Sequence, residues 1–243
     1  MIKSAFLVIY NLQKVTIRKN FLGQDMLYYF YETFNINIFS YITFRAGFAF
    51  LLSFVLTTIF IPIFIKWAKS KNAMQPIYNF APLAHKKKQN TPTMGGLIFT
   101  ASSLIGVCAS ADLQNNFVLI AIVCLLSFGL IGFYDDIRKI LFTSNEKGLS
   151  SRAKFALQFI FAGLVSGLLF LAEFPTNLYL PMLKAPIVNM GIWAIIFWSF
   201  VIVASSNATN LTDGLDGLAT VPSIFAFLSL AVFMYISGHA ILA

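Results

Sequence analysis

Residues 191–217 read GIWAIIFWSFVIVASSNATNLTDGLDG. The first part of this stretch, up to Ser206, is apolar apart from three serines, whereas the second part places Asp213 and Asp216 among asparagines, threonines and glycines. A helix needs about 20 apolar residues to cross the roughly 30 Å hydrocarbon core of a bilayer. The stretch therefore predicts a membrane-spanning helix that ends in a polar cluster at the membrane surface.

The whole chain has the composition of a membrane protein. Of its 243 residues, 58% are hydrophobic and 11% are charged, whereas a soluble domain carries about 25% charged residues. Six segments are apolar enough to span a bilayer, namely residues 45–65, 94–111, 117–134, 153–174, 187–205 and 218–237. They lack the polar face at a period of about 3.6 residues that a soluble helical bundle shows. We expect an all-α, polytopic membrane protein with about six transmembrane helices.

Lysine and arginine are distributed unequally between the loops. Successive spans alternate in direction, so the loops after the first, third and fifth spans share one face of the membrane. These loops carry ten basic residues, against only Lys184 in the other loops: Lys66, Lys69, Lys71, Lys86, Lys87, Lys88, Arg138, Lys139, Lys147 and Arg152. Basic loops are retained in the cytoplasm, so the first set is predicted to be cytoplasmic. The same bias explains the net charge of +8 without a nucleic-acid partner.

Residues 1–25 do not fit this topology, because they carry four basic residues although the alternation would place the N-terminus on the outer face. Two interpretations are open. Either the native chain begins at Met26, or residues 1–25 form an amphipathic arm on the membrane surface. We favour the first, which leaves residues 26–243 as the N-terminal portion of one transmembrane domain.

Three polar clusters fall in loops predicted to face the cytoplasm. Asp135 and Asp136 follow the third span in GFYDDIRKI, and the segment 207–217 follows the fifth. The third cluster, residues 85–96, reads HKKKQNTPTMGG and follows the first span. Its basic run could simply contact anionic lipid headgroups, but its threonines, and its glycines at a helix start, also suit a phosphate group. His85 then lies where it could contact that phosphate.

Two adjacent carboxylates at the cytoplasmic end of a helix are unfavourable unless their charge is compensated. Asp135 and Asp136 repel each other and oppose the helix dipole, so we expect a cation or a substrate nearby. A solvated helix end, paired with the basic residues that follow, is the alternative.

Asp213 and Asp216 are three residues apart, which places both on one face if their segment is helical. The neighbouring glycines leave a broken helix open as well. Carboxylate and amide oxygens suit Mg²⁺, and Mg²⁺ together with lysine supplies the charge neutralisation that phosphoryl transfer requires.

Five segments, YITFRAGFAF, HKKKQNTPTMGG, GFYDDIRKI, KGLSSRAKFALQ and NATNLTDGLDGLA, occur in this order between about residue 26 and the end of the chain. Together they resemble the bacterial phospho-N-acetylmuramoyl-pentapeptide transferases, which belong to the polyprenyl-phosphate N-acetylhexosamine-1-phosphate transferase superfamily. The first and fourth segments favour this family over relatives that use UDP-N-acetylglucosamine.

The resemblance implies a reaction and its partners. Such enzymes transfer phospho-MurNAc-pentapeptide from UDP-MurNAc-pentapeptide to undecaprenyl phosphate, giving lipid I and UMP in the first membrane step of peptidoglycan synthesis. The reaction depends on Mg²⁺ and takes place at the cytoplasmic face of the bacterial inner membrane. Full-length members are expected to form homodimers.

The resemblance also implies roles for individual residues. Asp135 and Asp136 look like the catalytic aspartate pair, with Asp135 as the base that deprotonates the lipid phosphate. Asp216 is a third catalytic candidate and, with Asp136, a candidate Mg²⁺ ligand. The substrate-binding candidates are Lys88 and Thr93 of the HxxKxxTPTMGG motif, Asn210 and Asp213 on the uridine and phosphate side, and His85.

In one respect this sequence departs from the family pattern. The family fold has ten spans, of which about six are present here. A later FMGDxGSLALG stretch, which carries a principal Mg²⁺ ligand, and a later histidine-rich motif do not occur. We therefore expect a C-terminally truncated chain, or one half of a split protein, that is inactive as a transferase by itself.

Two other functions account for part of the pattern. A membrane prenyltransferase acting on aromatic acceptors uses paired DDxxD motifs, but here the two aspartates are followed by Ile137, Arg138 and Lys139, so the third aspartate is lacking. A transporter or an ion-binding subunit would usually carry its carboxylates near the bilayer midplane, whereas these carboxylates are predicted at one membrane surface. Both functions stay open as alternatives.

Overall fold

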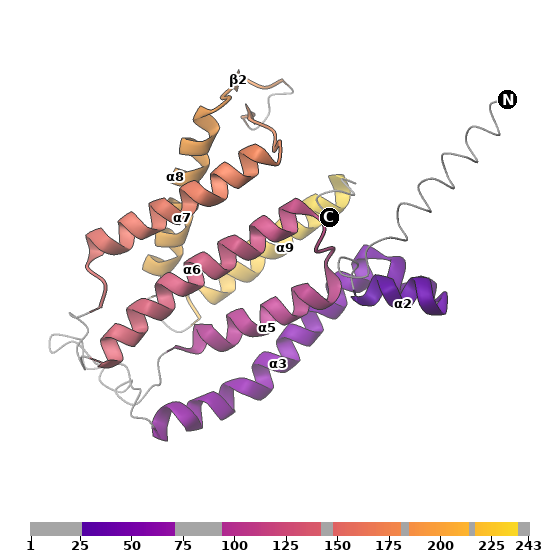
Figure 1. Ribbon diagram of the computed structural model, residues 1–243, viewed down its shortest axis with the longest axis horizontal. Helices are drawn as coiled ribbons and strands as arrows, with labels where there is room; N and C mark the ends of the chain where they lie inside the picture. The colour runs from indigo at the N-terminus through magenta and orange to yellow at the C-terminus, as the bar shows by residue number, and fades with distance from the viewer. Residues whose placement is uncertain (1–25, 71–93, 142–147, 181–184, 214–216, 238–243) are drawn as a thin grey trace.

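The computed structural model describes residues 26–70, 94–141, 148–180, 185–213 and 217–237, and over these ranges the chain is almost entirely helical (Figure 1). The helices are α2 (Met26–Phe34), the short 3₁₀ helix η1 (Asn37–Ser40), α3 (Ile42–Ser70), α5 (Gly95–Ser110), α6 (Asn116–Leu141), α7 (Ser151–Leu171), α8 (Trp193–Thr212) and α9 (Thr220–Ser237). Within the described residues the only strands are β1 (Asn177–Leu178) and β2 (Val188–Asn189), which pair antiparallel. The predicted all-α class is confirmed.

Each of the six predicted spans coincides with one of these helices. Helices α3, α6, α7 and α8 are long and apolar enough to cross a membrane, whereas α5 and residues 220–233 of α9 are shorter apolar helical stretches. Large apolar side chains such as Phe50, Ile160 and Phe227 are exposed on the outer faces of the helices. The chain is therefore a multi-pass membrane protein.

The fifth span is displaced from its predicted position at both ends. It is predicted over residues 187–205, but Val188 and Asn189 pair with β1 instead, and α8 begins only at Trp193, after Gly191 has taken a positive φ of 50°. At its other end α8 continues through the polar residues to Thr212. There the polar side chains are satisfied within the helix: Asn207, Thr209 and Thr212 donate to the carbonyls of Val203, Ser205 and Ala208.

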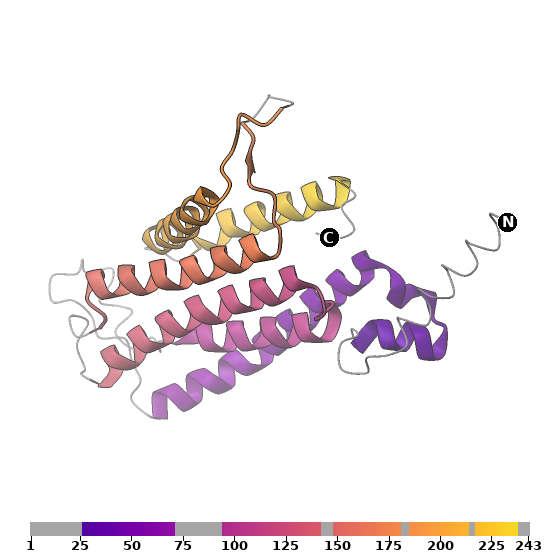
Figure 2. The ribbon, with the colours of Figure 1, turned by 45° about the horizontal axis from the view of Figure 1, so that its top comes forward.

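The helices alternate in direction, as predicted. The last residues of α3, α6 and α8 and the first residues of α5, α7 and α9 lie toward the same end of the bundle, on the left and lower-left side of Figure 1, and Figure 2 agrees for α3, α5, α6 and α7. We call this end the polar end; it is defined by Ser70, Leu141, Thr212, Gly95, Ser151 and Thr220. All three loops that carry the predicted polar clusters leave from it. The β1–β2 hairpin lies at the opposite end.

Helices α3 and α5 pack at very short range because small residues face each other. Gly106 is buried, and the Ser53 hydroxyl donates to the Ser102 carbonyl at 3.1 Å. A methyl group on Gly106 would overlap the Ser53 hydroxyl and lie 2.8 Å from the Ala49 carbonyl oxygen. Small residues that allow such close approach are the usual means of helix association in lipid, where apolar surface gains little by leaving its surroundings.

Helices α7 and α8 combine small residues with polar contacts. Ala162 and Ser166 are fully buried, and the Ser199 hydroxyl donates to the Ser166 hydroxyl at 3.1 Å. Nearer the polar end, the Asn207 amide donates to the side-chain oxygen of buried Gln158 at 2.8 Å. This hydrogen bond joins the KGLSSRAKFALQ segment to the NATNLTDGLDG segment, so packing connects two motifs that lie far apart in the sequence.

We predict that Gly106→Ala separates α3 from α5, because one of the atoms that must give way is the backbone carbonyl of Ala49. Overpacking of this kind costs about 1–3 kcal/mol. The check is the thermal unfolding midpoint in detergent micelles. Gly163→Ala in α7 is the matched control, because an added methyl meets nothing within 4 Å there. Equal midpoints for the two variants would contradict the close packing.

We also predict an energetic coupling between Gln158 and Asn207 of about 0.6–2 kcal/mol, the range found for interhelical hydrogen bonds in membranes. The measurement is a double-mutant cycle on unfolding in micelles, using Gln158→Leu, Asn207→Leu and the double variant. Ser229→Ala serves as a control, because the Ser229 hydroxyl donates to the Phe225 carbonyl of its own helix and not across the Gln158–Asn207 contact. Strictly additive losses at Gln158 and Asn207 would show that the contact contributes nothing.

Candidate active site

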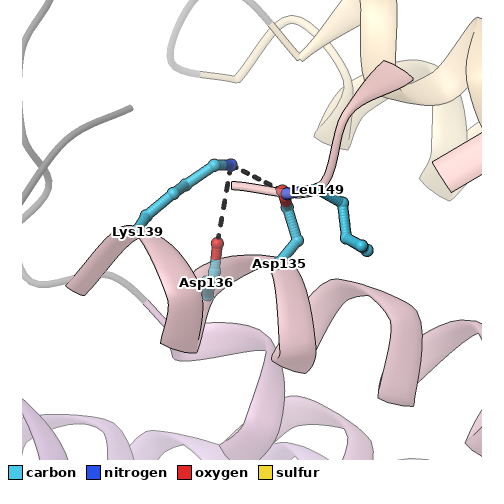
Figure 3. Close-up of polar contacts among 4 residues, drawn as sticks. All are labelled: Asp135, Asp136, Lys139 and Leu149. Atoms are coloured by element: carbon cyan, nitrogen blue, oxygen red, sulfur yellow. Dashed lines mark hydrogen bonds and ion pairs between the residues drawn. The ribbon is translucent and has the colours of Figure 1, made fainter. Parts of the chain in front are cut away.

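The continuation of α6 beyond the predicted end of its span places the aspartate pair. The helix runs on to Leu141, so Asp135, Asp136 and Lys139 all lie in its last two turns. A spacing of four residues puts Asp135 and Lys139 on the same helix face. Their side chains meet there: the Lys139 ammonium lies 2.6 Å from Oδ2 of Asp135 and 4.0 Å from Oδ1 of Asp136 (Figure 3).

The turn before α7 supplies the second contact to Asp135. The backbone N–H of Leu149 donates to Oδ1 of Asp135 at 2.8 Å (Figure 3). The next residue, Ser150, is the N-cap of α7 and accepts a hydrogen bond from the Ala153 amide at 3.2 Å. The same short turn therefore starts α7 and holds a carboxylate of α6.

Asp135 is buried, with only 7% of its surface exposed. Burying a carboxylate is costly unless it is paired and hydrogen-bonded. Here each carboxylate oxygen has a partner, Lys139 on Oδ2 and the Leu149 amide on Oδ1, and Lys154 in the first turn of α7 adds a further electrostatic attraction. Pairing with a basic residue that follows belongs to the alternative interpretation of a solvated helix end, but Asp135 is buried and not solvated.

Asp136 occupies a different environment one residue later. Its side chain is 31% exposed, and its distance of 4.0 Å from the Lys139 ammonium is longer than a direct hydrogen bond. Of the two carboxylates, Asp136 is the more accessible to a substrate or a metal ion.

The described residues contain no cluster of three or more His, Cys, Asp or Glu that could by itself hold a metal ion. Mg²⁺, however, usually takes only one or two protein carboxylates, together with water and substrate phosphates. Asp136 fits that role by its chemistry and exposure. Asp216, the other candidate ligand, lies outside the described residues.

The polar end of α8 carries the next candidates. Asn210 is exposed in the last turn, and Asp213 is exposed as the C-cap residue, with its amide bonded to the Thr209 carbonyl at 3.1 Å. The helix stops before Asp213, so the broken-helix interpretation holds at this position and a continuous helix through Asp213 does not. Gly217 follows with a positive φ of 82°, a conformation that glycine adopts readily where the chain turns into α9.

The structure thus brings Asp135 and Asp136 to the same end of the bundle as Asn210 and Asp213 (Figure 1). His85, Lys88 and Thr93 lie outside the described residues, as does Asp216. Met94, the first described residue after them, is the N-cap of α5 with a positive φ of 71°.

Sequence reasoning did not single out Gly148 or the Leu149 amide as parts of the site. The only signal for them was their place in the KGLSSRAK segment. From the sequence, Lys139 is one of the basic residues that set the topology and could neutralise a solvated helix end, and its spacing of four residues from Asp135 is the signal that identifies the pair.

Two family models match parts of this chain. Residues 118–243, which include all but the first two residues of α6 and the whole of α7, α8 and α9, match the profile of glycosyl transferase family 4. Residues 88–99, which include the start of α5, match signature 1 of phospho-N-acetylmuramoyl-pentapeptide-transferase.

Similar proteins from three bacteria bear the name phospho-N-acetylmuramoyl-pentapeptide-transferase. The chain is 52% identical to the protein of Campylobacter curvus over 217 residues, which are 89% of this chain and 61% of the relative. For Nautilia profundicola the identity is 53%, over 88% of this chain and 60% of the relative, and for Nitratiruptor it is 52%, over 90% and 62%. The chain therefore spans about three fifths of the length of these relatives.

The family profile covers about half of the chain, including the helix that holds the aspartate pair and the helix that carries Asn210. With the signature and the relatives in agreement, this chain belongs to glycosyl transferase family 4 and is similar to its phospho-N-acetylmuramoyl-pentapeptide-transferases.

Proposed function

We propose that the protein acts as a phospho-N-acetylmuramoyl-pentapeptide-transferase at the cytoplasmic face of the bacterial inner membrane. It would transfer phospho-MurNAc-pentapeptide from UDP-MurNAc-pentapeptide to undecaprenyl phosphate, giving lipid I and UMP. The observation that carries the proposal is the aspartate pair at the polar end of the bundle, within a chain about half identical to transferases of that name. A site at the membrane surface suits a reaction between a lipid phosphate and a soluble nucleotide.

The proposed chemistry is a phosphoryl transfer. An oxygen of undecaprenyl phosphate forms a bond to the phosphorus that carries the sugar, and the bond from that phosphorus to UMP breaks. Such a reaction depends mainly on positioning and on neutralising negative charge. Mg²⁺, when bound, would neutralise charge on the phosphates.

The protein groups divide this work. Asp136, the more accessible carboxylate, would be the protein ligand of Mg²⁺ together with Asp216. Asp135 would accept a proton from the lipid phosphate or orient it. Asn210 and Asp213, with Lys88, Thr93 and His85, would bind the nucleotide and its phosphates.

The cytoplasmic assignment rests on charge. The loops predicted from the sequence at the polar end, which include the adjoining helix turns, carry ten basic residues, against one in the other loops, and basic loops are retained in the cytoplasm. Carboxylates at one end of the bundle also differ from the midplane position that is typical of a transport path, which favours the transferase over an ion-binding subunit.

We predict that Asp136→Asn lowers transferase activity about 100-fold or more, the usual loss when one group that stabilises transition-state charge is removed. Because this chain is expected to be inactive by itself, lipid I formation is measured first with the full-length relative from Campylobacter curvus, before and after the aligned aspartate is replaced. Membranes that contain this chain are assayed in parallel, and lipid I formation by the chain alone would overturn the expected inactivity.

Asp112→Asn is the matched control. Asp112 lies between α5 and α6 at the opposite end of the bundle, and its Oδ1 accepts from the Gln114 amide at 2.8 Å, a contact that asparagine can keep. Full activity of the Asp136 variants in both proteins would remove the catalytic interpretation.

We predict that chelation of divalent cations abolishes the reaction and that added Mg²⁺ restores it, because the proposed site needs a cation to neutralise the phosphates. Thermal unfolding with Mg²⁺ and without substrate tests whether the ion binds to the protein at Asp136. Mg²⁺ should raise the thermal unfolding midpoint of the unaltered protein more than that of Asp136→Asn. Undiminished activity in excess chelator would contradict the metal dependence.

A further inference from the structure

Gly148 lies directly against the Asp135–Lys139 pair. A methyl group at its Cα would stand 2.7 Å from Oδ1 of Asp135, 3.0 Å from Cε of Lys139 and 3.3 Å from Cγ of Lys139. Gly148 is not among the described glycines with a positive φ. The backbone conformation therefore does not require a glycine here, and the requirement is one of space.

The residue after Gly148 makes the contact that this space permits. The Leu149 amide reaches Oδ1 of Asp135 at 2.8 Å, while Lys139 holds Oδ2 at 2.6 Å (Figure 3). The two donors come from different elements, one from the turn before α7 and one from α6 itself. Two hydrogen bonds to different oxygens leave the carboxylate little freedom to rotate.

We propose that Gly148 and the Leu149 amide form a positioning turn that fixes the Asp135 carboxylate in the orientation required for the reaction. Gly148 acts by leaving room for the approach of the turn, and Leu149 acts by donating its N–H. Neither needs to touch the substrate. The proposal rests on the proposed function for its catalytic consequence, whereas the contact between the turn and Asp135 can be tested without any activity.

The substitution that tests Gly148 should displace the site and leave the fold intact. The three atoms nearest to an added methyl belong to the side chains of Asp135 and Lys139. This differs from Gly106, where a backbone carbonyl lies in the way. In Gly148→Ala the turn or the carboxylate must therefore move, and the Leu149–Asp135 hydrogen bond weakens.

Hydrogen–deuterium exchange of the Leu149 amide, measured on the 243-residue chain in detergent micelles, reads this contact directly. We expect exchange about tenfold faster in Gly148→Ala and in Asp135→Ala, since both lose a hydrogen bond to a charged acceptor. Gly132→Ala is the matched control: it makes the same change one turn before Asp135, where an added methyl meets nothing within 4 Å, and it should leave the exchange unchanged.

A double variant separates action through Asp135 from general loosening of the turn. In the Asp135→Ala background the acceptor is already absent, so Gly148→Ala should add little further exchange at Leu149. Two results would overturn the positioning role. One is a double variant whose effect on the exchange of the Leu149 amide equals the sum of the effects of the two single variants. The other is unchanged exchange in Gly148→Ala.

The catalytic consequence is tested by kinetics of lipid I formation. Gly148→Ala should lower kcat about tenfold to 100-fold with little change in the KM for the nucleotide substrate, because a displaced catalytic group affects the reacting geometry more than binding. Gly132→Ala should retain the activity of the unaltered protein. An unchanged kcat in Gly148→Ala would refute the catalytic consequence.

The two measurements keep the proposals distinguishable. If neither this chain nor its full-length relative forms lipid I, the proposed function fails, and the exchange of the Leu149 amide still decides whether the turn positions Asp135. If lipid I forms and depends on Asp136 but not on Gly148, the function stands and the positioning role is refuted.

Discussion

The hydrocarbon core of a bilayer offers no hydrogen-bond partner to a peptide group, and the rest of this structure follows from that constraint. Every backbone donor and acceptor within the membrane must be satisfied inside the protein, which favours helices. Irregular backbone and charge are left to the helix ends. The polar segment of α8 obeys the same rule, because Asn207, Thr209 and Thr212 bond back to carbonyls of their own helix before the chain turns at Asp213.

Helix association in lipid gains little from apolar burial, so packing here depends on small residues and a few polar contacts. Gly106 brings α3 and α5 together, and Ser166 and Ser199 lie in the interface of α7 and α8. The Gln158–Asn207 hydrogen bond has a further consequence. It ties the helix that begins beside Asp135 to the helix that ends at Asp213, so the packing that stabilises the bundle also sets the separation of two polar clusters.

Within the site, the two adjacent aspartates differ in their surroundings more than in their chemistry. Asp135 is buried and held at both oxygens, whereas Asp136 is partly exposed and lies farther from Lys139. A carboxylate that is held in place suits a task of orientation or proton acceptance at a fixed point. An accessible carboxylate suits the binding of a metal ion that arrives with the substrate. This division resolves the repulsion expected between two neighbouring charges, because Lys139 lies close to one and within 4.0 Å of the other.

The sequence by itself determined the all-α membrane fold, the six apolar helices, their alternation and the gathering of the polar clusters at one end, because hydropathy and loop charge are local properties of the chain. It also identified Asp135 and Asp136 as site candidates. Only the tertiary structure decided which aspartate is buried, that α8 begins after a hairpin and ends at Thr212, and that Gly148 and the Leu149 amide support Asp135. The support of Asp135 and the packing of α7 on α8 depend on contacts between residues far apart in the sequence, such as Leu149 with Asp135 and Asn207 with Gln158. Their geometry is set by how the helices pack, which no local pattern of residues specifies.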